Sequence, residues 1–219
     1  MSVRHLILGQ EMCLLPEKAL FWPSKDMLII ADLHLGKAGH FRKSGIPIPS
    51  AIHLHDLDLL TSLLHQTHAC HLLFLGDLFH STPNHEWLQF EQWLQSWLNK
   101  NPTHRATLAM GNHDIHGEKQ LPSCLSICAQ YEEEGIVFSH EPVHPSSILP
   151  HQYNLSGHLH PAVNLRLRGR SAVKLPCFYL GKKQGILPAF GQFNGHLSMP
   201  INTQTDIFMV VEGKVLKYG

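Results

Sequence analysis

The sequence predicts an α/β fold built from two β-sheets. Along the first 160 residues, short apolar runs recur and end abruptly in polar residues, as buried strands that lead into tight turns do. Helical patterns lie between the first of these runs, and strand–helix–strand order favours an α/β domain. Beyond residue 160 the helical signals fade and strand-like runs remain. This part of the chain is therefore expected to form a second, largely antiparallel sheet packed on the first.

The strands expected before residue 160 occupy segments 27–32, 71–77, 106–114, 135–142 and 153–160. Residues 50–65 and 85–98 carry apolar side chains at helical spacing, which predicts two helices. The aromatic residues of the second helix are expected in the core. The strand-like runs after residue 160 are VNLRLRG, AVKLPCFYL, ILPAFG, DIFMVV and KVLKY.

Composition limits the classes of protein to which the chain can belong. The chain has 219 residues with 17 basic and 17 acidic side chains, so bulk charge gives no reason to expect binding to nucleic acid or a membrane. Five cysteines are too few for a disulfide scaffold, and no apolar stretch is long enough to span a membrane. No linker or repeat stands out. We therefore expect a single domain over residues 1–219 in a soluble cytoplasmic protein with reduced thiols.

Residues that can bind metals follow all five strands expected before residue 160. In chain order they are Asp32 and His34, Asp77, Asn112 and His113, His140, and His158 and His160. Ligands of open α/β sheets bind at the carboxyl ends of the strands, so these side chains are expected to meet. One polar residue at a strand end is ordinary turn chemistry, but five such ends are not. The total of 19 histidines is weak evidence for a metal site by itself, so the evidence lies in the positions of these histidines after the strands.

The donor atoms of this set indicate which ions it could hold. Carboxylate, imidazole and amide donors without a thiolate suit Mn²⁺, Zn²⁺ or Fe. Seven ligands are too many for one tetrahedral zinc, whereas two ions roughly 3.5–4 Å apart use them all if one carboxylate bridges. Two aspartates leave two divalent ions with net positive charge. We therefore expect an anionic substrate, and a phosphate ester fits.

The motifs DLH, GD, GNHD, a lone His after a strand, and GHLH occur in that order between residues 32 and 160. In this order, each after a β-like run, they resemble the calcineurin-like metallophosphoesterases. The resemblance implies an αββα sandwich of two mixed β-sheets flanked by helices over nearly the whole chain. It also implies a hydrolase with two divalent metal ions, in which metal-bound hydroxide attacks the phosphorus of a phosphate ester.

The same resemblance assigns roles to the motif residues. The implied ligands are Asp32, His34 and His160 for the first metal and Asn112, His140 and His158 for the second, with Asp77 as the bridge. His113 is similar to the family's catalytic histidine, which stabilises or protonates the leaving oxygen. Asp114 is expected to orient that histidine.

The stretch SGHLHPAV (156–163) places two histidines two positions apart. In an extended chain such residues share one face, so the pair can hold one ion together or reach two neighbouring ions. The roles implied by the resemblance favour the second arrangement. We expect His158 and His160 to be split between the two metals.

A closer resemblance lies in the stretches ADLHLGKAGHFRKSGIPIP, LGDLFHS, SGHLHP and LPAFGQFNG. They are similar to the bacterial ligase-associated DNA-damage-response phosphoesterases or endonucleases. That subgroup is similar to manganese-dependent phosphodiesterases, and its genes lie near those of an ATP-dependent DNA ligase and a helicase. The resemblance implies a nuclease or phosphodiesterase that favours Mn²⁺, acts in DNA repair with DNA as substrate, and associates functionally with that ligase and helicase.

Other functions stay open. The same metal site serves a small-molecule phosphatase or a nucleotide pyrophosphatase, and a partner-binding scaffold can keep the fold without activity. The intact ligand set disfavours the scaffold. Protein Ser/Thr phosphatases of the superfamily carry an aspartate and an arginine soon after GD, whereas this chain reads GDLFHSTPN, which argues against a phosphoprotein phosphatase.

Basic residues near the motifs are candidates for substrate binding. Lys37 and Arg42 follow DLHLG and could contact phosphate oxygens, although solvated loop charge explains them equally well. Arg166 and Arg168 share one strand face and could either track a nucleic-acid backbone or protect an edge strand from aggregation. His80 is interpreted as a surface or packing residue.

Overall fold

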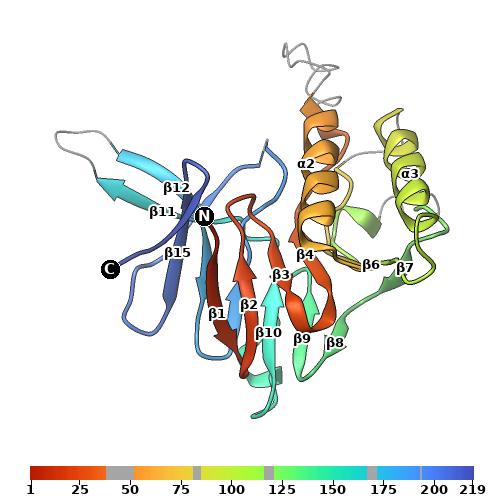
Figure 1. Ribbon diagram of the computed structural model, residues 1–219. Helices are drawn as coiled ribbons and strands as arrows, with labels where there is room; N and C mark the ends of the chain where they lie inside the picture. The colour runs from red at the N-terminus through yellow and green to blue at the C-terminus, as the bar shows by residue number, and fades with distance from the viewer. Residues whose placement is uncertain (38–51, 81–84, 116–120, 167–171, 193) are drawn as a thin grey trace.

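Two β-sheets form the centre of the molecule, and two α-helices lie beside the first of them (Figure 1). The computed structural model describes residues 1–37, 52–80, 85–115, 121–166, 172–192 and 194–219. The helices are α2 (Ile52–Thr67) and α3 (His85–Leu98), with short 3-10 turns at Pro23–Lys25 and Pro145–Ser147. Within these described ranges, no helix is long and apolar enough to cross a membrane.

The first sheet has the strand order β1-β2-β3-β4-β5-β6-β7. The strands are β1 (Val3–Ile7), β2 (Gln10–Leu14), β3 (Leu20–Trp22), β4 (Met27–Ala31), β5 (His71–Leu75), β6 (Arg105–Ala109) and β7 (Ser126–Cys128). Strands β1 to β4 pair antiparallel and β4 to β7 pair parallel, so the sheet is mixed. Strands β4 and β5 are buried at every position, which explains their nearly continuous apolar sequences.

The second sheet has the order β14-β11-β12-β13-β10-β9-β8, and β15 pairs with both β12 and β16. The strands are β8 (Tyr131–Glu133), β9 (Ile136–Ser139), β10 (Tyr153–Ser156), β11 (Pro161–Arg166), β12 (Ala172–Leu180), β13 (Gln184–Ile186), β14 (Leu197–Ser198), β15 (Asp206–Val211) and β16 (Lys214–Lys217). Strand β10 lies between β9 and β13 and is parallel to both, whereas β12 is antiparallel to its neighbours. This sheet is also mixed.

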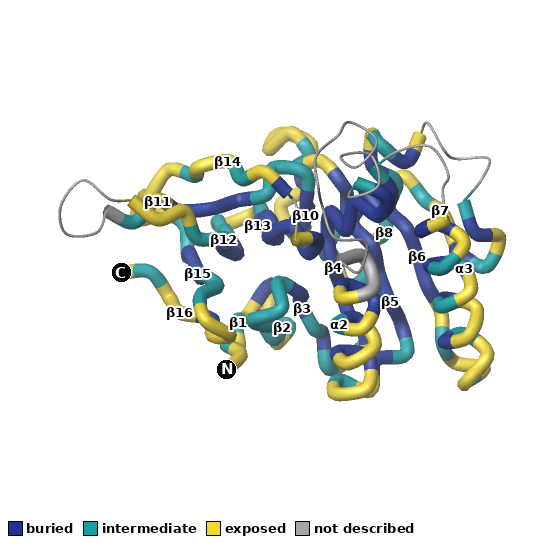
Figure 2. The backbone as a smooth tube through the Cα atoms, turned by 90° about the horizontal axis from the view of Figure 1, so that it is seen from above, coloured by how far each residue is buried: buried dark blue, intermediate teal, exposed yellow. Residues whose placement is uncertain are grey.

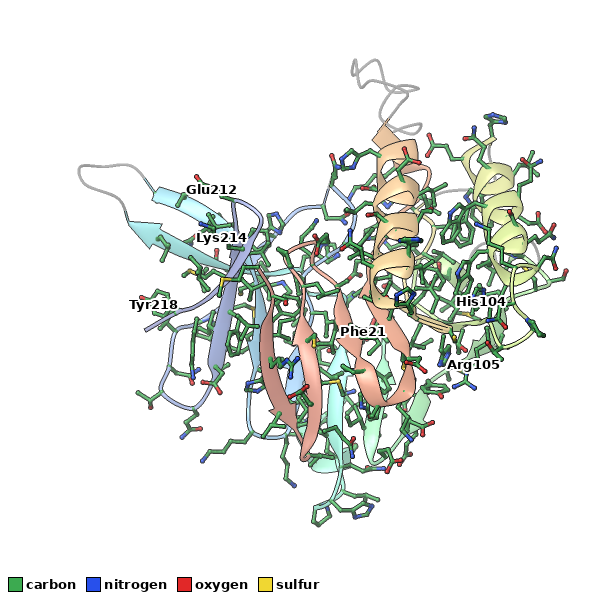
Figure 3. The ribbon with its side chains drawn as sticks, in the orientation of Figure 1. Phe21, His104, Arg105, Glu212, Lys214 and Tyr218 are labelled. Carbon is green, nitrogen blue, oxygen red and sulfur yellow. The ribbon has the colours of Figure 1, made fainter. Side chains whose placement is uncertain are left out.

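Two apolar layers join these elements. Between the sheets, Leu73 of β5 belongs to the same buried cluster as Phe138 of β9 and Leu155 of β10. On the other face of the first sheet, residues of α2 and α3 such as Phe90 pack on β4, β5 and β6, and Phe21 of β3 adds to this layer (Figure 3). Figure 2 shows β4, β5 and β6 as largely buried strands beside α2 and α3, whose outer faces are exposed.

The predicted fold class is confirmed, because the chain is α/β with two mixed sheets and few helices. Both α-helices described here cover the outer face of the first sheet. The helix predicted over 85–98 has those bounds, and the helix predicted over 50–65 appears as α2. Aromatic and leucine side chains at helical spacing determine these elements, because they need one buried face.

Several parts of the fold differ from the expectation, and the short strands β7, β8 and β14 are among those that were not predicted. Strands β1, β2 and β3 were not predicted, since their sequences mix polar and apolar residues without a long buried run. The expected strand ILPAFG was wrong beyond Ile186, where β13 ends. Pro188 has no amide hydrogen to donate, and the segment crosses between sheets. The amide of Leu187 bonds the carbonyl of Ser156 in the second sheet, and that of Phe190 bonds Ala31 in the first.

Candidate metal centre

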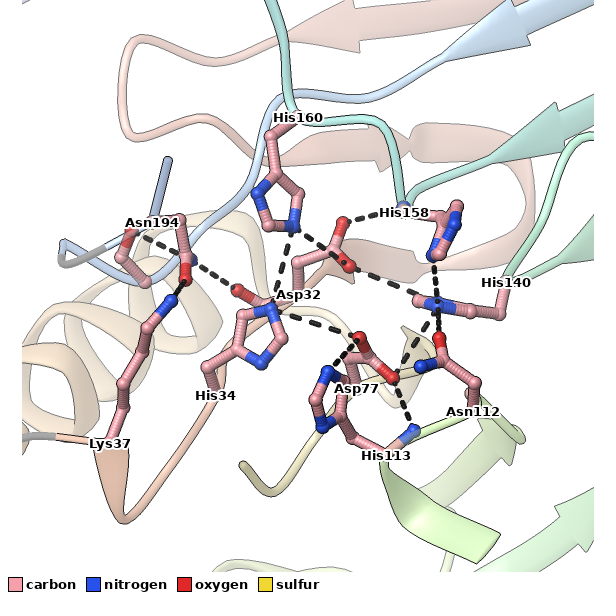
Figure 4. A network of polar contacts seen from close by, with 12 residues as sticks. Asp32, His34, Lys37, Asp77, Asn112, His113, His140, His158, His160 and Asn194 are labelled. Carbon is pink, nitrogen blue, oxygen red and sulfur yellow. Dashed lines mark hydrogen bonds and ion pairs between the residues drawn. The ribbon is translucent and has the colours of Figure 1, made fainter. Parts of the chain in front are cut away.

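The carboxyl ends of five strands meet at one edge of the two sheets (Figure 4). The predicted site residues leave these ends as Asp32 and His34 after β4, Asp77 after β5, Asn112 and His113 after β6, His140 after β9, and His158 and His160 after β10. The two sheets are joined here directly, because the amide of His158 donates to Oδ2 of Asp32 at 2.9 Å. The structure therefore brings all seven predicted ligands together, from elements far apart in the sequence.

Asp32, His34 and His160 form one group that could hold a metal ion. Nε2 of His160 lies 3.4 Å from Nε2 of His34 and 3.3 Å from Oδ1 of Asp32. The other ring nitrogen of His160, Nδ1, lies 2.9 Å from the carbonyl oxygen of Gly195. In the neutral ring that contact places the hydrogen on Nδ1, so Nε2 presents a lone pair to the group.

Asp77, His140 and His158 form a second group of the same kind. Nε2 of His140 lies 2.9 Å from Nδ1 of His158, 3.0 Å from Oδ1 of Asn112 and 3.4 Å from Oδ1 of Asp77. Nδ1 of His140 lies 3.1 Å from the carbonyl oxygen of Leu75, which fixes the ring with Nε2 toward the group. Donor atoms of His158, Asn112 and Asp77 therefore all lie within 3.4 Å of Nε2 of His140.

The Asp77 carboxylate lies between the two groups. Its Oδ2 lies 3.8 Å from Nε2 of His34, while its Oδ1 lies 3.4 Å from Nε2 of His140. Oδ1 also accepts a hydrogen bond from the backbone amide of His113 at 3.0 Å, which holds the carboxylate in place. A carboxylate with one oxygen toward each group has the placement of a bridging ligand.

The residues fit divalent cations. Oδ1 of Asp32 is buried and accepts no hydrogen bond, which is a costly arrangement unless a cation compensates the charge. Burial, together with the charges of nearby Lys37 and His160, lowers the pKa of His34 to about 2, so the ring stays in the neutral form that binds metals. Burial also lowers the pKa of His160, but the adjacent Asp32 carboxylate outweighs burial, so that pKa is raised overall.

The backbone is strained where the candidate ligands lie. Five of the seven have positive φ: Asp32 (54°), His34 (51°), Asp77 (47°), His158 (66°) and His160 (46°). Residues other than glycine seldom adopt this conformation, and they keep it only when surrounding contacts impose it. Such strain is concentrated at functional sites, where it aims side chains that an unstrained turn would direct elsewhere.

This strain corrects the expectation for SGHLHPAV. Strand β10 ends at Ser156 and β11 begins at Pro161, so the two histidines do not share the face of an extended strand. Both instead occupy left-handed positions in the turn between the strands. His158 faces His140 and His160 faces His34, so the pair is divided between the two groups by turn geometry.

His113 lies at the rim of the site. Its side chain is 38% exposed, and its Nε2 lies 3.9 Å from Oδ2 of Asp77. Its ring is 5.5 Å from that of His34 and 5.0 Å from that of His80, measured between centroids. His80 therefore borders the site, although the sequence favoured a surface or packing role. Nothing in the sequence distinguishes His80 from the many other histidines of the chain.

Asp114 contacts two turns of the site rather than the His113 ring. Its Oδ2 accepts from the amide of Gly111 at 2.9 Å, and its Oδ1 accepts from the amide of Phe79 at 3.1 Å. Burial raises its pKa to about 6, against the lowering effect of these two bonds. The expected orienting role is thus corrected: Asp114 fixes the turns after β5 and β6 against each other.

Asn194 was missed, although it lies in the stretch LPAFGQFNG that carried the closer resemblance. Its Nδ2 donates to the backbone carbonyl of Asp32 at 2.9 Å, and its Oδ1 accepts from Nζ of Lys37 at 3.0 Å. Burial lowers the pKa of Lys37, while the charges of Asp32 and Asp77 raise it. The structure therefore places Lys37 beside the first group. Arg42 lies outside the described residues.

Of the comparisons with known proteins, one with a solved structure agrees with the fold. No family model matches the chain, and no curated protein gives a significant match. Among solved structures, the Pseudomonas putida nuclease MPE is similar over 100% of both chains, with 25% identity and a TM-score of 0.81. A weaker likeness, with 16% identity and a TM-score of 0.46, is to the phosphoesterase Yfce from E. coli over 87% of this chain and 96% of that one. The fold and the ordered strand-end residues that it gathers are consistent with a calcineurin-like metallophosphoesterase.

Proposed function

We propose that the chain is a dinuclear metal-dependent phosphodiesterase that cleaves nucleic acid, with Mn²⁺ favoured over Zn²⁺ or Fe. The observation that carries the proposal is the Asp77 carboxylate, which directs one oxygen toward each ligand group. Ions held by the two groups would suit in-line displacement at phosphorus, because they would stabilise the charge on the reacting oxygens. Full-length similarity to a nuclease supports nucleic acid as the substrate class.

Bound ions would supply positive charge that acidifies a water and holds the phosphoryl oxygens. The chain supplies the placement: the carbonyls of Leu75 and Gly195 orient the rings of His140 and His160. His113, at the partly exposed rim beside Asp77, donates a proton to the leaving oxygen. Lys37, held by Asn194, contacts a phosphate oxygen of the substrate.

We further propose DNA as the physiological substrate of a single cytoplasmic domain, and functional association with an ATP-dependent DNA ligase and a helicase. The resemblance of ADLHLGKAGHFRKSGIPIP and LPAFGQFNG to the ligase-associated phosphoesterases supports this proposal. Bulk charge does not contribute to it, because the formal net charge is zero. DNA must therefore be held by local charge and by the metal ions.

Asp77→Asn and His113→Ala test the mechanism. Each should abolish Mn²⁺-dependent hydrolysis of a model diester while the circular dichroism spectrum stays that of the wild type, because the first removes the bridging charge and the second the proton donor. Asp58→Asn and His65→Ala are matched controls at exposed positions of α2 and should keep full activity. Full activity in Asp77→Asn and His113→Ala would refute the mechanism.

A metal and substrate screen tests the substrate class. The wild type, stripped of metal and reloaded with Mn²⁺, Zn²⁺ or Fe²⁺, is assayed on a monoester, a diester, and single- and double-stranded DNA. The proposal expects the highest kcat/KM on diesters and cleavage of DNA. Preference for monoesters together with inert DNA would favour the small-molecule phosphatase, and no turnover on any ester would favour the scaffold.

A further inference from the structure

A hollow of about 340 Å³ opens beside the second ligand group. Asn112 and His140 form its inner wall, so anything bound there lies next to that group. The remaining wall comes from the end of β6, the turn after β7 and the segment after β9. Its volume is at the lower end of the range for small-molecule sites and suits one ring system rather than a folded chain.

Apolar side chains make up much of the remaining lining of the hollow. Met110, Ile115, Ala129, Pro142 and Val143 contribute to it. Ile115, two positions after the predicted catalytic histidine, is 59% exposed. An exposed apolar side chain at the mouth of a concave site gains contact area when an uncharged group enters.

The segment after β9 is held rigidly by Asn154, which is fully buried in β10. Its Nδ2 donates to the Ser139 hydroxyl at 2.9 Å, and its Oδ1 accepts from the amide of Val143 at 3.1 Å. Ser139 in turn donates to the carbonyl of Glu141 at 2.7 Å. The wall is thus preformed, so binding there costs little conformational ordering.

The charge of the lining excludes a second phosphate group. Among the described lining residues there is no lysine or arginine, and the carboxylate of Glu141 would repel an anion. Lys37, by contrast, lies beside the first group and bonds Asn194. The hollow is therefore suited to an uncharged substituent of the substrate.

His113 is not among the residues that line this hollow. Its ring lies beside those of His34 and His80, on the side of the first group. The leaving oxygen that His113 protonates and a group inside the hollow must then be two different substituents of one phosphorus. A monoester has one organic substituent and cannot fill both positions, whereas a diester can.

We propose that the hollow is a subsite for the uncharged, non-leaving substituent of a phosphodiester, with room for a single planar ring system such as a nucleobase. This inference rests on the proposed function, since it needs hydrolysis at the adjacent metal centre. The subsite is a specificity determinant beside Asn112 and His140. Because a diester can fill it and a monoester cannot, the subsite explains a preference for diesters through binding.

The test holds the leaving group constant and varies the other substituent. The Mn²⁺-loaded full chain is assayed with phenyl p-nitrophenyl phosphate, methyl p-nitrophenyl phosphate and p-nitrophenyl phosphate. We expect kcat/KM for the phenyl diester to exceed that for the methyl diester by roughly tenfold or more, because an apolar subsite distinguishes substituents that differ by several carbons. The monoester should be slowest.

Two substitutions connect this preference to the hollow. Ile115→Asn removes apolar wall and Ala129→Trp fills the space, and each should reduce the phenyl-to-methyl ratio several-fold. Leu88→Asn is the matched control, since Leu88 is 57% exposed on α3 and lies outside the lining. Circular dichroism checks that each variant is folded. If one of the two variants does not fold, the other still tests the subsite.

The possible failures are distinguishable. A phenyl-to-methyl ratio that stays the same in wild type, Ile115→Asn and Ala129→Trp would overturn the subsite while leaving the metal-dependent hydrolysis intact. A monoester hydrolysed as fast as the phenyl diester would also overturn it. No hydrolysis of any of the three esters with Mn²⁺, Zn²⁺ or Fe²⁺ would refute the proposed function itself, and this inference with it.

Discussion

Gly157→Ala should weaken metal binding at the first group without removing any ligand. Gly157 lies just after β10, where its backbone passes close to the turn after β4. A Cβ atom at this position would lie 2.6 Å from Oδ2 of Asp32 and 2.7 Å from Cβ of Ala31. Both neighbours are buried, so neither can move into solvent. The methyl group must therefore displace the Asp32 carboxylate or the turn that carries His158 and His160.

The displacement is large for a metal ligand. Ordinary contact begins near 3.4 Å, so the new Cβ atom and Oδ2 of Asp32 must separate by about another 0.8 Å. Metal–ligand distances tolerate only about 0.2 Å. Loss of a hydrogen bond that supports a ligand lowers metal affinity by about 10–100-fold. A ligand displaced by more than the tolerance should lower metal affinity at least as much.

Calorimetric titration of Mn²⁺ into metal-free protein measures this effect. The wild type should show two sites, and Gly157→Ala should show one of them weakened by about 10–100-fold. Gly195→Ala is the matched control: Gly195 also lies beside the first group, through its carbonyl to His160, but a Cβ there meets nothing within 4 Å. Identical titrations for the wild type and Gly157→Ala would refute the reasoning that this glycine makes room for Asp32.

Two other predictions follow from the structure. His158→Ala should weaken the second site and His160→Ala the first, because they face different groups; equal losses at both sites in each variant would contradict the division. Burial lowers the pKa of His71 from 6.5 to about 4, so the stability that its neutral ring contributes is complete above pH 6.5 and falls by about 3 kcal/mol as the pH drops to 4. In His71→Gln, whose side chain can still bond Thr107, the free energy of unfolding should depend less on pH, as measured by urea denaturation at several pH values. The exposed His65→Gln should not show this change, and equal slopes in all three proteins would count against the burial effect.

The sequence predicted the fold best where burial is simplest. Strands β4 and β5 are buried throughout, and a continuous apolar run that ends in polar residues is the pattern such strands require. The bounds of α3 were predicted because its aromatic residues repeat at helical spacing. The strands at the N-terminal edge were missed, because a strand such as β2 takes its place from its neighbours rather than from a strong pattern of its own.

The residues that join the site from a distance could not be predicted. Asn194 contacts the carbonyl of Asp32 from 162 positions away, and nothing in its local sequence requires this. His80 borders the rings of His34 and His113, but one histidine among 19 carries no distinguishing pattern. Asp114 lies inside a predicted motif, yet its partners are backbone amides of two turns.

The sequence by itself determined which side chains could meet, because a run of parallel strands brings its carboxyl ends to one edge and each strand end carries a potential ligand. Only the tertiary structure decided how they divide into two groups. The left-handed backbone at Asp32, His34, Asp77, His158 and His160 has no signature in residue type, since none of these residues is glycine. Contacts between the two sheets impose it, such as the bond from the amide of His158 to Asp32. Those turns aim neighbouring histidines at different groups and leave one carboxylate between them.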